Sequence, residues 1–255
     1  MAKTRAGTLT LPVTHSIGAI QEDIINCSRC SRLRDYCSEV AQIKRKSYLK
    51  DQYWGKPIAG FGTQNANLVI IGLAPAAHGA NRTGRVFTGD RSGDWLYRAL
   101  FKAGFANQPQ AHNIDDGLIL NNCYITCAVK CAPPDNKPTP AELETCGFHL
   151  ERELQALTEV KVFVALGQIA YKALWTYISK RINHSNQPST DGNTPASRRP
   201  DFKHGAQISL PGNQSLLLSY HPSQQNTFTG RLTEPMFDGI FNQVKVKLAE
   251  QRHGL

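Results

Sequence analysis

Two segments of the chain place polar and aromatic side chains among small residues, as ligand-binding loops do. The first runs from Gly72 to Asp90, and its glycines leave backbone N–H groups open to a ligand. It leads into a predicted helix, whose N-terminus favours anions. Phe87 offers a flat ring on which a base could stack. A nucleotide-phosphate loop is an alternative, although the Gly-Lys-Ser/Thr of a P-loop is absent from this segment.

The second segment runs from Tyr220 to Arg231 and contains the candidate residue His221. A single histidine in a sequence more often has a structural role than a chemical one. Here, however, the histidine directly follows a predicted strand and precedes a polar loop that ends in an arginine. This position makes His221 a candidate functional residue.

Four of the seven cysteines have a spacing that is typical of metal ligands. Cys27 and Cys30 form a Cys-x-x-Cys pair on one turn, and Cys131 and Cys146 follow much later with fourteen residues between them. Four thiolates suit either zinc or an iron–sulfur cluster. The spacing does not choose between the two.

The charge of the chain indicates an anionic partner. Its 255 residues include 29 Lys plus Arg against 20 Asp plus Glu, a formal net charge of +9. Such a surplus attracts polyanions over long range without identifying them. The chain has no apolar run of about 18 residues, which a transmembrane helix needs, and residues 1–13 lack the apolar stretch of a signal peptide. We therefore expect a cytoplasmic protein, where disulfides are rare.

The hydrophobic pattern predicts strands that alternate with helices. This alternation is typical of an α/β fold with three layers, α/β/α, around a central and mostly parallel sheet; we expect four strands and one domain over residues 1–255. Ser92 is expected to cap the helix that follows the first loop, and Thr139-Pro140 to open another helix. The sequence offers five candidates for the strands of this four-stranded sheet, at 67–72, 122–129, 160–166, 207–210 and 216–220. The predicted helices lie at 14–46 with a break at 27–30, 92–104, 139–157, 168–178 and 233–250. Residues 1–15 are expected to be a tail and 184–200 a surface insertion.

Ligands of such sheets bind beyond the carboxyl ends of the parallel strands. Three loops leave strands at that edge, after Gly72, Val129 and Tyr220. The first and third of these loops are the two segments described above, so we expect them to form one site.

These two loops resemble the signature motifs of the family 5 uracil-DNA glycosylases. Residues 72–79 match motif one, Gly-Leu-Ala-Pro-Ala-Ala-His-Gly, and residues 221–223 match the His-Pro-Ser of motif two. Other families of this superfamily carry Asp, Asn or Glu where Leu73 and Ala74 stand, which favours family 5 and removes the obvious general base. Relatives often carry Asn at the position of Thr126-Cys127.

The resemblance implies a monofunctional DNA repair glycosylase, which flips a deaminated base out of the duplex and hydrolyses its N-glycosidic bond. Uracil is the implied substrate, and we expect hypoxanthine as well because residues 74–77 are small and apolar. His221 is the expected hydrogen-bond donor to the departing base, and Asn81 and His78 are expected to hold the water or the sugar. The expected base-contacting residues are Gly72, Leu73, Ala74 and Phe87; the expected DNA-binding residues are Arg82, Arg85, Ser223, Gln224, Asn226 and Arg231.

Similar proteins hold a [4Fe-4S] cluster with this layout of ligands, so the resemblance implies such a cluster on Cys27, Cys30, Cys131 and Cys146. The other three cysteines are then expected to be buried and apolar. The implied partner is double-stranded DNA with deaminated bases, bound by a monomer that reaches the nucleoid through DNA and has no membrane contact. A non-catalytic iron–sulfur protein that binds DNA or senses damage is the alternative: the missing carboxylate of the first loop supports it, and His221 opposes it.

Overall fold

The computed structural model describes residues 16–185 and 198–251. The expected tail at 1–15 and residues 186–197 of the expected insertion lie outside these described residues. Within the described ranges, no helix is both long enough and apolar enough to cross a membrane.

The centre of the fold is one mixed sheet of six strands in the order β1-β3-β2-β4-β6-β5. The four inner strands are parallel to one another, as the sequence predicts. The edge strands β1 and β5 pair antiparallel with β3 and β6. The expected number of four strands therefore describes the parallel centre alone. The bounds are β1 Phe61–Gly62, β2 Leu68–Gly72, β3 Cys123–Cys127, β4 Val162–Leu166, β5 Gln207–Leu210 and β6 Gln214–Ser219.

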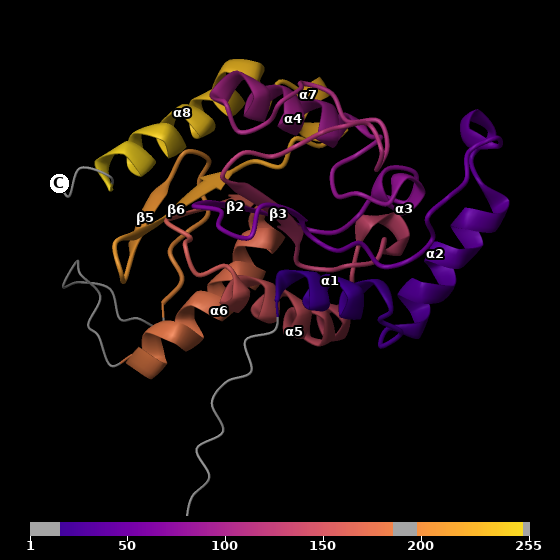
Figure 1. The fold of residues 1–255 in the computed structure, drawn as a ribbon, viewed down its shortest axis with the longest axis horizontal. Coiled ribbons are helices and arrows are strands. Elements are labelled where there is room, and N and C mark those ends of the chain that lie inside the picture. The colour runs from indigo at the N-terminus through magenta and orange to yellow at the C-terminus, as the bar shows by residue number, and fades with distance from the viewer. Residues whose placement is uncertain (1–15, 186–197, 252–255) are drawn as a thin grey trace, which may run out of the picture.

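Helices cover both faces of the sheet, which confirms the predicted three layers (Figure 1). Helices α4 and α8 pack together on one face, and α1, α5 and α6 lie on the other. The bounds are α1 Ile17–Ile25, α2 Ser31–Ile43, α3 Ala80–Thr83, α4 Arg91–Ala103, α5 Pro140–Ala156, α6 Gln168–Ser185, α7 Gln224–Phe228 and α8 Glu234–Glu250, with 3₁₀ turns η1 at Lys46–Tyr48 and η2 at Pro134–Asn136.

The side chains of strand β2 are buried on both faces of the sheet. Leu68 and Ile70 pack into the core that α4 and α8 cover, whereas Val69 and Ile71 pack into the core that α5 and α6 cover. Successive side chains of a strand point to opposite faces, so an uninterrupted apolar run is the signature of a strand between two layers.

Local capping sets where the helices begin. Thr139 and Glu142 form the reciprocal capping box of α5, with Pro140 in its first turn. Helix α4, however, has its N-cap two residues earlier than the sequence predicts. Its N-cap is Asp90, whose carboxylate accepts a hydrogen bond from the N–H of Gly93, so the expectation for Ser92 is wrong. This places a carboxylate at the end of the first loop.

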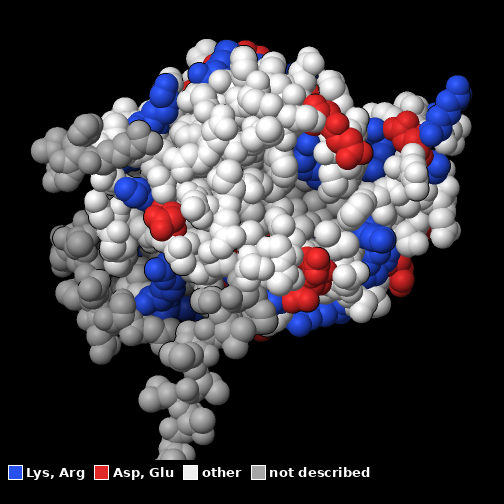
Figure 2. Space-filling model, viewed as in Figure 1, with Lys and Arg blue, Asp and Glu red and all other residues white. Residues whose placement is uncertain are grey.

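The charged side chains do not form one continuous basic patch on the face shown in Figure 2. Lysines and arginines lie around its margin with acidic residues among them, and much of its centre is uncharged. The net charge of +9 is therefore not concentrated on this face.

Candidate functional site

The first and third loops meet at the carboxyl edge of the parallel strands. Gly72 at the end of β2 is in register with Cys127 at the end of β3, and Leu166 of β4 is in register with Ser219 of β6. The loops that follow these strands therefore start side by side, as the sequence predicts.

Phe87 folds back over the start of its own loop and contacts the third loop. Its backbone has φ +51°, which is uncommon for a residue with a side chain. A Cβ atom on Gly72 would lie 2.7 Å from the Phe87 ring, so only glycine lets the ring lie this close to β2. The ring also stacks on that of His221, with centroids 5.9 Å apart and planes inclined by 28°.

His221 is held by its backbone and by its neighbours. Asn226 donates a hydrogen bond from Nδ2 to the His221 carbonyl at 2.9 Å. Gly167 has φ +92°, and a Cβ atom there would lie 3.3 Å from the His221 Cβ. Burial lowers the pKa of His221 to about 4, so the ring is neutral at neutral pH. A neutral imidazole retains one N–H donor.

A cavity of about 290 Å³ opens beside His221. This is close to the lower limit of about 300 Å³ for small-molecule sites. Its walls combine Leu73 of the first loop, the start of α6, and both ends of the third loop. The lining residues are Leu73, Leu166, Gly167, Gln168, Ile169, Ala170, Phe202, Tyr220, His221, Asn226 and Arg231.

Asp90 supplies a carboxylate that the sequence analysis missed. A Cβ atom on Gly79 would overlap this carboxylate, which places it against the first loop. Burial raises the pKa of Asp90, and hydrogen bonds from the backbone of Gly93 and Ser92 oppose that rise. Its charge also contributes to raising the pKa of the Cys127 thiol, an effect that burial dominates. Its position between a glycine-rich loop and a predicted helix is a signal in the sequence for an N-cap, the role that the sequence analysis gives to Ser92.

The two other catalytic candidates, His78 and Asn81, also belong to the first loop. The Nδ1 atom of His78 is 2.9 Å from the Tyr53 hydroxyl, and burial, with Arg45 and Arg82 nearby, lowers the pKa of the His78 ring. Asn81 is 1% exposed and donates from Nδ2 to the Cys37 carbonyl of α2 at 3.3 Å. Neither residue lines the cavity. The structure therefore assigns Asn81 to packing between the loop and α2 rather than to the cavity wall.

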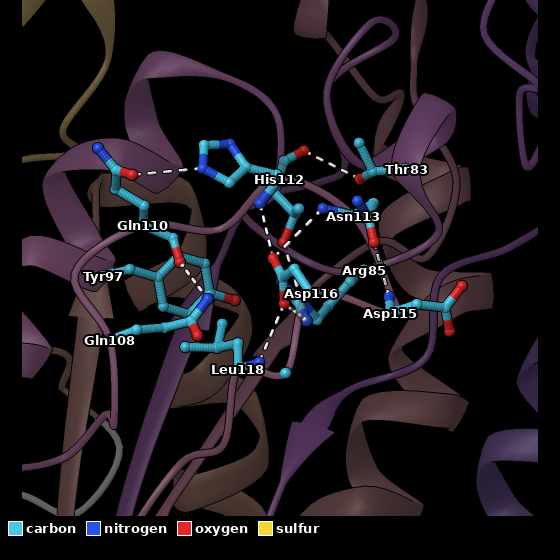
Figure 3. Close-up of polar contacts among 12 residues, drawn as sticks. Thr83, Arg85, Tyr97, Gln108, Gln110, His112, Asn113, Asp115, Asp116 and Leu118 are labelled. Carbon is cyan, nitrogen blue, oxygen red and sulfur yellow. Dashed lines mark hydrogen bonds and ion pairs between the residues drawn. The ribbon is translucent and has the colours of Figure 1, made fainter.

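Arg85, a predicted phosphate contact, is buried and already has an acidic partner. The Arg85 guanidinium is 3% exposed and forms a bidentate ion pair with Asp116, at 2.9 Å and 2.6 Å (Figure 3). Although burial opposes ionisation of Asp116, the hydrogen bond from Arg85 keeps the pKa of that carboxyl well below its usual range. Asp116 also accepts hydrogen bonds from the backbone N–H groups of His112 and Leu118. Arg85 thus fastens the 105–121 loop to the first loop.

Arg82 also has internal partners. Its guanidinium pairs with Asp51 at 2.7 Å, and donates to the carbonyls of His78 at 2.8 Å and Gly89 at 3.1 Å. It lies 3.9 Å above the Tyr48 ring as well. The structure gives Arg82 the role of closing the first loop on itself, in place of the expected phosphate contact.

The third loop presents the remaining DNA-binding candidates. Ser223 caps the short helix α7 by accepting a hydrogen bond from the Asn226 N–H at 3.3 Å, and Gln224 is exposed. The Arg231 guanidinium lies 4.6 Å from the centre of the Tyr220 ring, at the rim of the cavity. These side chains are therefore grouped around one loop.

Phe228, at the end of α7, was not identified from the sequence. Its side chain is 69% exposed, and the Arg91 guanidinium lies 4.4 Å from the ring centre. Arg91 also donates to the Thr227 hydroxyl at 3.1 Å, which ties α7 to the start of α4. An exposed aromatic ring held at the tip of a loop is a candidate contact for another molecule.

The four predicted ligand cysteines are brought together from two distant segments. Cys131 and Cys146 are 7% exposed each and share one apolar cluster, against which Cys30 packs. Burial, followed by the charges of Cys131 and Cys27, raises the pKa of Cys30; burial raises the pKa of Cys146 to about 12, with Cys131 and Cys30 contributing. These shifts favour the protonated thiols, so a metal centre bound here would have to displace their protons. Among the described residues, no three His, Cys, Asp or Glu side chains converge as ligands of a single metal ion.

Several basic groups surround the four cysteines. The Lys130 N–H donates to the Cys146 Sγ at 3.2 Å, and an Arg34 Nη1 lies 4.0 Å from the Cys131 Sγ. The Lys130 ammonium is buried and pairs with Glu153. The N–H groups that point at the cysteine sulfur atoms would stabilise the negative charge of thiolates that hold a bound group. Cys37, one of the spare cysteines, is fully buried beside Cys131.

The sequence of this chain is similar to one known protein family and to several individual proteins. A family model described as the uracil DNA glycosylase superfamily matches residues 59–245. A protein named Type-5 uracil-DNA glycosylase from Mycobacterium leprae is 47% identical over 92% of this chain and 96% of its own length. Proteins of the same name from Mycobacterium bovis and Thermus thermophilus are 46% identical (88% of this chain, 78% of theirs) and 45% identical (89% and 96%).

Proposed function

This chain belongs to the uracil DNA glycosylase superfamily, and we propose that it is a DNA repair enzyme that hydrolyses the N-glycosidic bond of uracil in DNA. The observation that carries the proposal is the stack of Phe87 on His221 at the edge of a cavity of about 290 Å³. An aromatic ring and a neutral hydrogen-bond donor side by side are what the release of a base requires. The similar type-5 proteins extend over most of the chain, which supports the same activity.

The reaction would begin with the damaged base flipped out of the duplex, since its glycosidic bond is inaccessible within the stack. Phe87 would contact the face of the base. As the bond breaks, the sugar gains oxocarbenium character and negative charge develops on the base. The N–H of the neutral His221 would donate to a base oxygen and stabilise that charge, an effect typically of about 3–4 kcal/mol for one preorganised donor.

Asp90 is the carboxylate that we propose as the group that orients the attacking water. It is partly exposed, and burial raises its pKa, so it combines access to water with increased basicity. The argument for a purely binding protein was that Leu73 and Ala74 supply no carboxylate, and a carboxylate from Asp90, at the end of the same loop, would answer it. His78 would hold the sugar or a bound water molecule.

We propose that the enzyme is monofunctional and leaves an abasic site. Covalent β-elimination would need an amine nucleophile at the sugar. Lys130 is near the carboxyl end of β3, but its ammonium is 1% exposed, pairs with Glu153, and donates to the Cys127 carbonyl at 2.9 Å. A lysine in this environment cannot reach a substrate.

The substrate range would include hypoxanthine as well as uracil. The first loop contributes one apolar side chain, Leu73, to the cavity wall, and the side-chain amides of Gln168 and Asn226 lie on other parts of that wall. The donor from His221 suits any base that carries a carbonyl oxygen. Strict selection of one base would need a matched set of donors and acceptors on the same wall.

Double-stranded DNA would be held by the third loop. Arg231, at the cavity, and the exposed Gln224 would contact phosphates, and the exposed ring of Phe228 would enter the space that a flipped base leaves. The protein would act as a monomer, and a DNA substrate would keep it at the nucleoid.

Cys27, Cys30, Cys131 and Cys146 would hold a [4Fe-4S] cluster. Their four thiols, the backbone N–H of Lys130 on Cys146 and the Arg34 guanidinium beside Cys131 fit a cluster of this kind. When bound, the cluster would supply a structural link between the α1–α2 turn and the β3–α5 segment. The base-release chemistry itself would lie in the first and third loops.

The activity is tested with a labelled duplex that contains one uracil. After incubation, alkali cleaves any abasic site, and the expected product is a single shortened strand. The His221→Ala variant serves as the matched negative control on the same duplex. Binding of the duplex without cleavage by the wild type would contradict a glycosylase and favour a damage-sensing protein.

A further inference from the structure

His149 on α5 is a buried histidine that the proposed reaction does not use. Its side chain is 3% exposed, and neither ring nitrogen has a hydrogen-bond partner within residues 16–185 and 198–251. Buried polar groups in folded proteins are almost always paired, so an orphaned imidazole calls for a partner. The unpaired imidazole therefore points to a bound group as its partner.

The place of His149 in the fold shows which group lies next to it. The residue follows Cys146 by one helical turn, and both side chains are buried, so they share one face of α5. After burial, the charges of Lys130 and Arg29 have the largest effects on the pKa of His149. Lys130 precedes Cys131 in the chain, and Arg29 precedes Cys30. The imidazole therefore lies among the chain neighbours of three proposed ligands.

The nearby polar groups of the protein are already engaged. Glu153, one turn further along α5, accepts hydrogen bonds from the Gly60 N–H, the Tyr124 hydroxyl and the Thr126 hydroxyl, at 3.0, 3.0 and 2.7 Å, and pairs with Lys130. The Arg29 guanidinium lies 4.2 Å from the centre of the Phe148 ring. These contacts leave the His149 ring without an acceptor from its immediate surroundings.

We propose that His149 donates a ring N–H to a sulfur atom of the iron–sulfur cluster that the four cysteines hold. Neutral or protonated, an imidazole has at least one N–H donor. This inference rests on the cofactor assignment made above. It makes His149 a positioning residue for the cluster, with no part in base release.

The consequence is a measurable change in the cluster. Hydrogen bonds to the sulfur atoms are one of the properties that set the reduction potential of a cluster. A donor stabilises the reduced state, which carries one more negative charge, and so raises the reduction potential. Removing the donor is expected to make the cluster harder to reduce.

The test uses the holoprotein with His149→Leu, and His112→Leu as a matched control on an exposed loop. We expect the midpoint potential to fall in the His149→Leu variant, to stay at the wild-type value in His112→Leu, and to recover in part in His149→Gln, which restores an N–H donor. A midpoint potential unchanged in His149→Leu would overturn the proposal.

A second measurement needs no substitution and decides the matter if His149→Leu fails to fold. Wild-type protein labelled with ¹⁵N-histidine is reduced, and pulsed electron paramagnetic resonance is used to detect coupling between the cluster and a histidine nitrogen. Coupling is expected, and brown protein without it would overturn the role of His149 alone. Colourless protein that contains zinc would overturn this proposal together with the cofactor assignment, while the uracil-release assay would still test the glycosylase activity separately.

Discussion

The ring of Phe87 lies against the ring of His221, so the end of the first loop and the start of the third are joined by one aromatic contact. Phe87 is 8% exposed and reaches this position through a left-handed backbone conformation. Of the two rings, His221 lines the cavity, and Phe87 packs against it. The contact fixes the His221 imidazole, and a donor held in place before the base arrives is the condition for electrostatic catalysis without reorganisation.

The first prediction concerns the loss of the donor. His221→Ala is expected to reduce the single-turnover rate of uracil release by about 100- to 1,000-fold, the usual effect of removing one preorganised donor. The dissociation constant for a duplex should change little, because the ring faces the base and not the phosphates. His112→Ala is the matched control. Parallel loss of melting temperature and DNA affinity, with the chemical step intact at saturating DNA, would assign His221 a structural role instead.

The second prediction concerns pH. Burial lowers the pKa of His221 from 6.5 to about 4, so the unfolded chain binds more protons than the folded protein between these values. The contribution of His221 to the free energy of unfolding is therefore complete above pH 6.5 and is lost as the pH falls toward 4. The melting temperature of the wild type should fall more steeply over this range than that of His221→Gln. Identical slopes would mean that other groups cause the acid sensitivity.

The third prediction concerns Phe228. Phe228→Ala is expected to slow uracil release from a duplex by roughly tenfold, since filling the gap left by a flipped base offsets part of the few kcal/mol that unstacking costs. Release from single-stranded DNA should change much less. Phe101→Ala, which removes an exposed ring from α4, is the control. Equal losses on single- and double-stranded substrates would exclude a role in flipping.

The fourth prediction separates two arginines. Asp116→Ala leaves the Arg85 guanidinium buried and unpaired, which typically costs about 3–5 kcal/mol of stability. The salt dependence of DNA binding should stay at the wild-type value in this variant. Arg231→Ala should instead reduce the slope of log K against log salt by about 0.9, as expected for one phosphate contact, with little change in melting temperature. The reverse pattern would restore Arg85 as the DNA contact.

The fifth prediction concerns the cysteines. Cys30→Ser or Cys131→Ser is expected to yield colourless protein of lower stability, because each removes a proposed ligand of the cluster. Cys37→Ala is the sharper control, since Cys37 is buried next to Cys131 and yet is not a proposed ligand. Iron content and visible absorbance measure the outcome. Loss of colour in Cys37→Ala would mean that the ligand set is wrong.

The layers, the parallel strands and the meeting of two loops could be predicted from the sequence, because each depends on local patterns. The apolar run of β2 and the Thr139 capping box are signals within a few residues of each other. Strand β1 could not be predicted, because Phe61–Gly62 is only a two-residue edge defined by its pairing with β3. Its existence depends on β3, far along the chain.

Long-range partners also explain the errors within the site. Arg85 resembles a surface arginine until Asp116, from a separate loop, is brought against it. Asn81 looks available until α2 packs over the first loop. Asp90 was overlooked because its capping role was given to Ser92, which stands two residues later and also suits an N-cap.

The antiparallel strands at the two margins of the sheet have a consequence for crowded solutions. Strand β1 offers two residues and β5 four, so a neighbouring copy finds little free backbone along which to extend the sheet. Short margins of this kind protect against edge-to-edge aggregation. When the protein is concentrated, precipitation should therefore respond to ionic strength and surface charge rather than develop the cross-β signature of fibres.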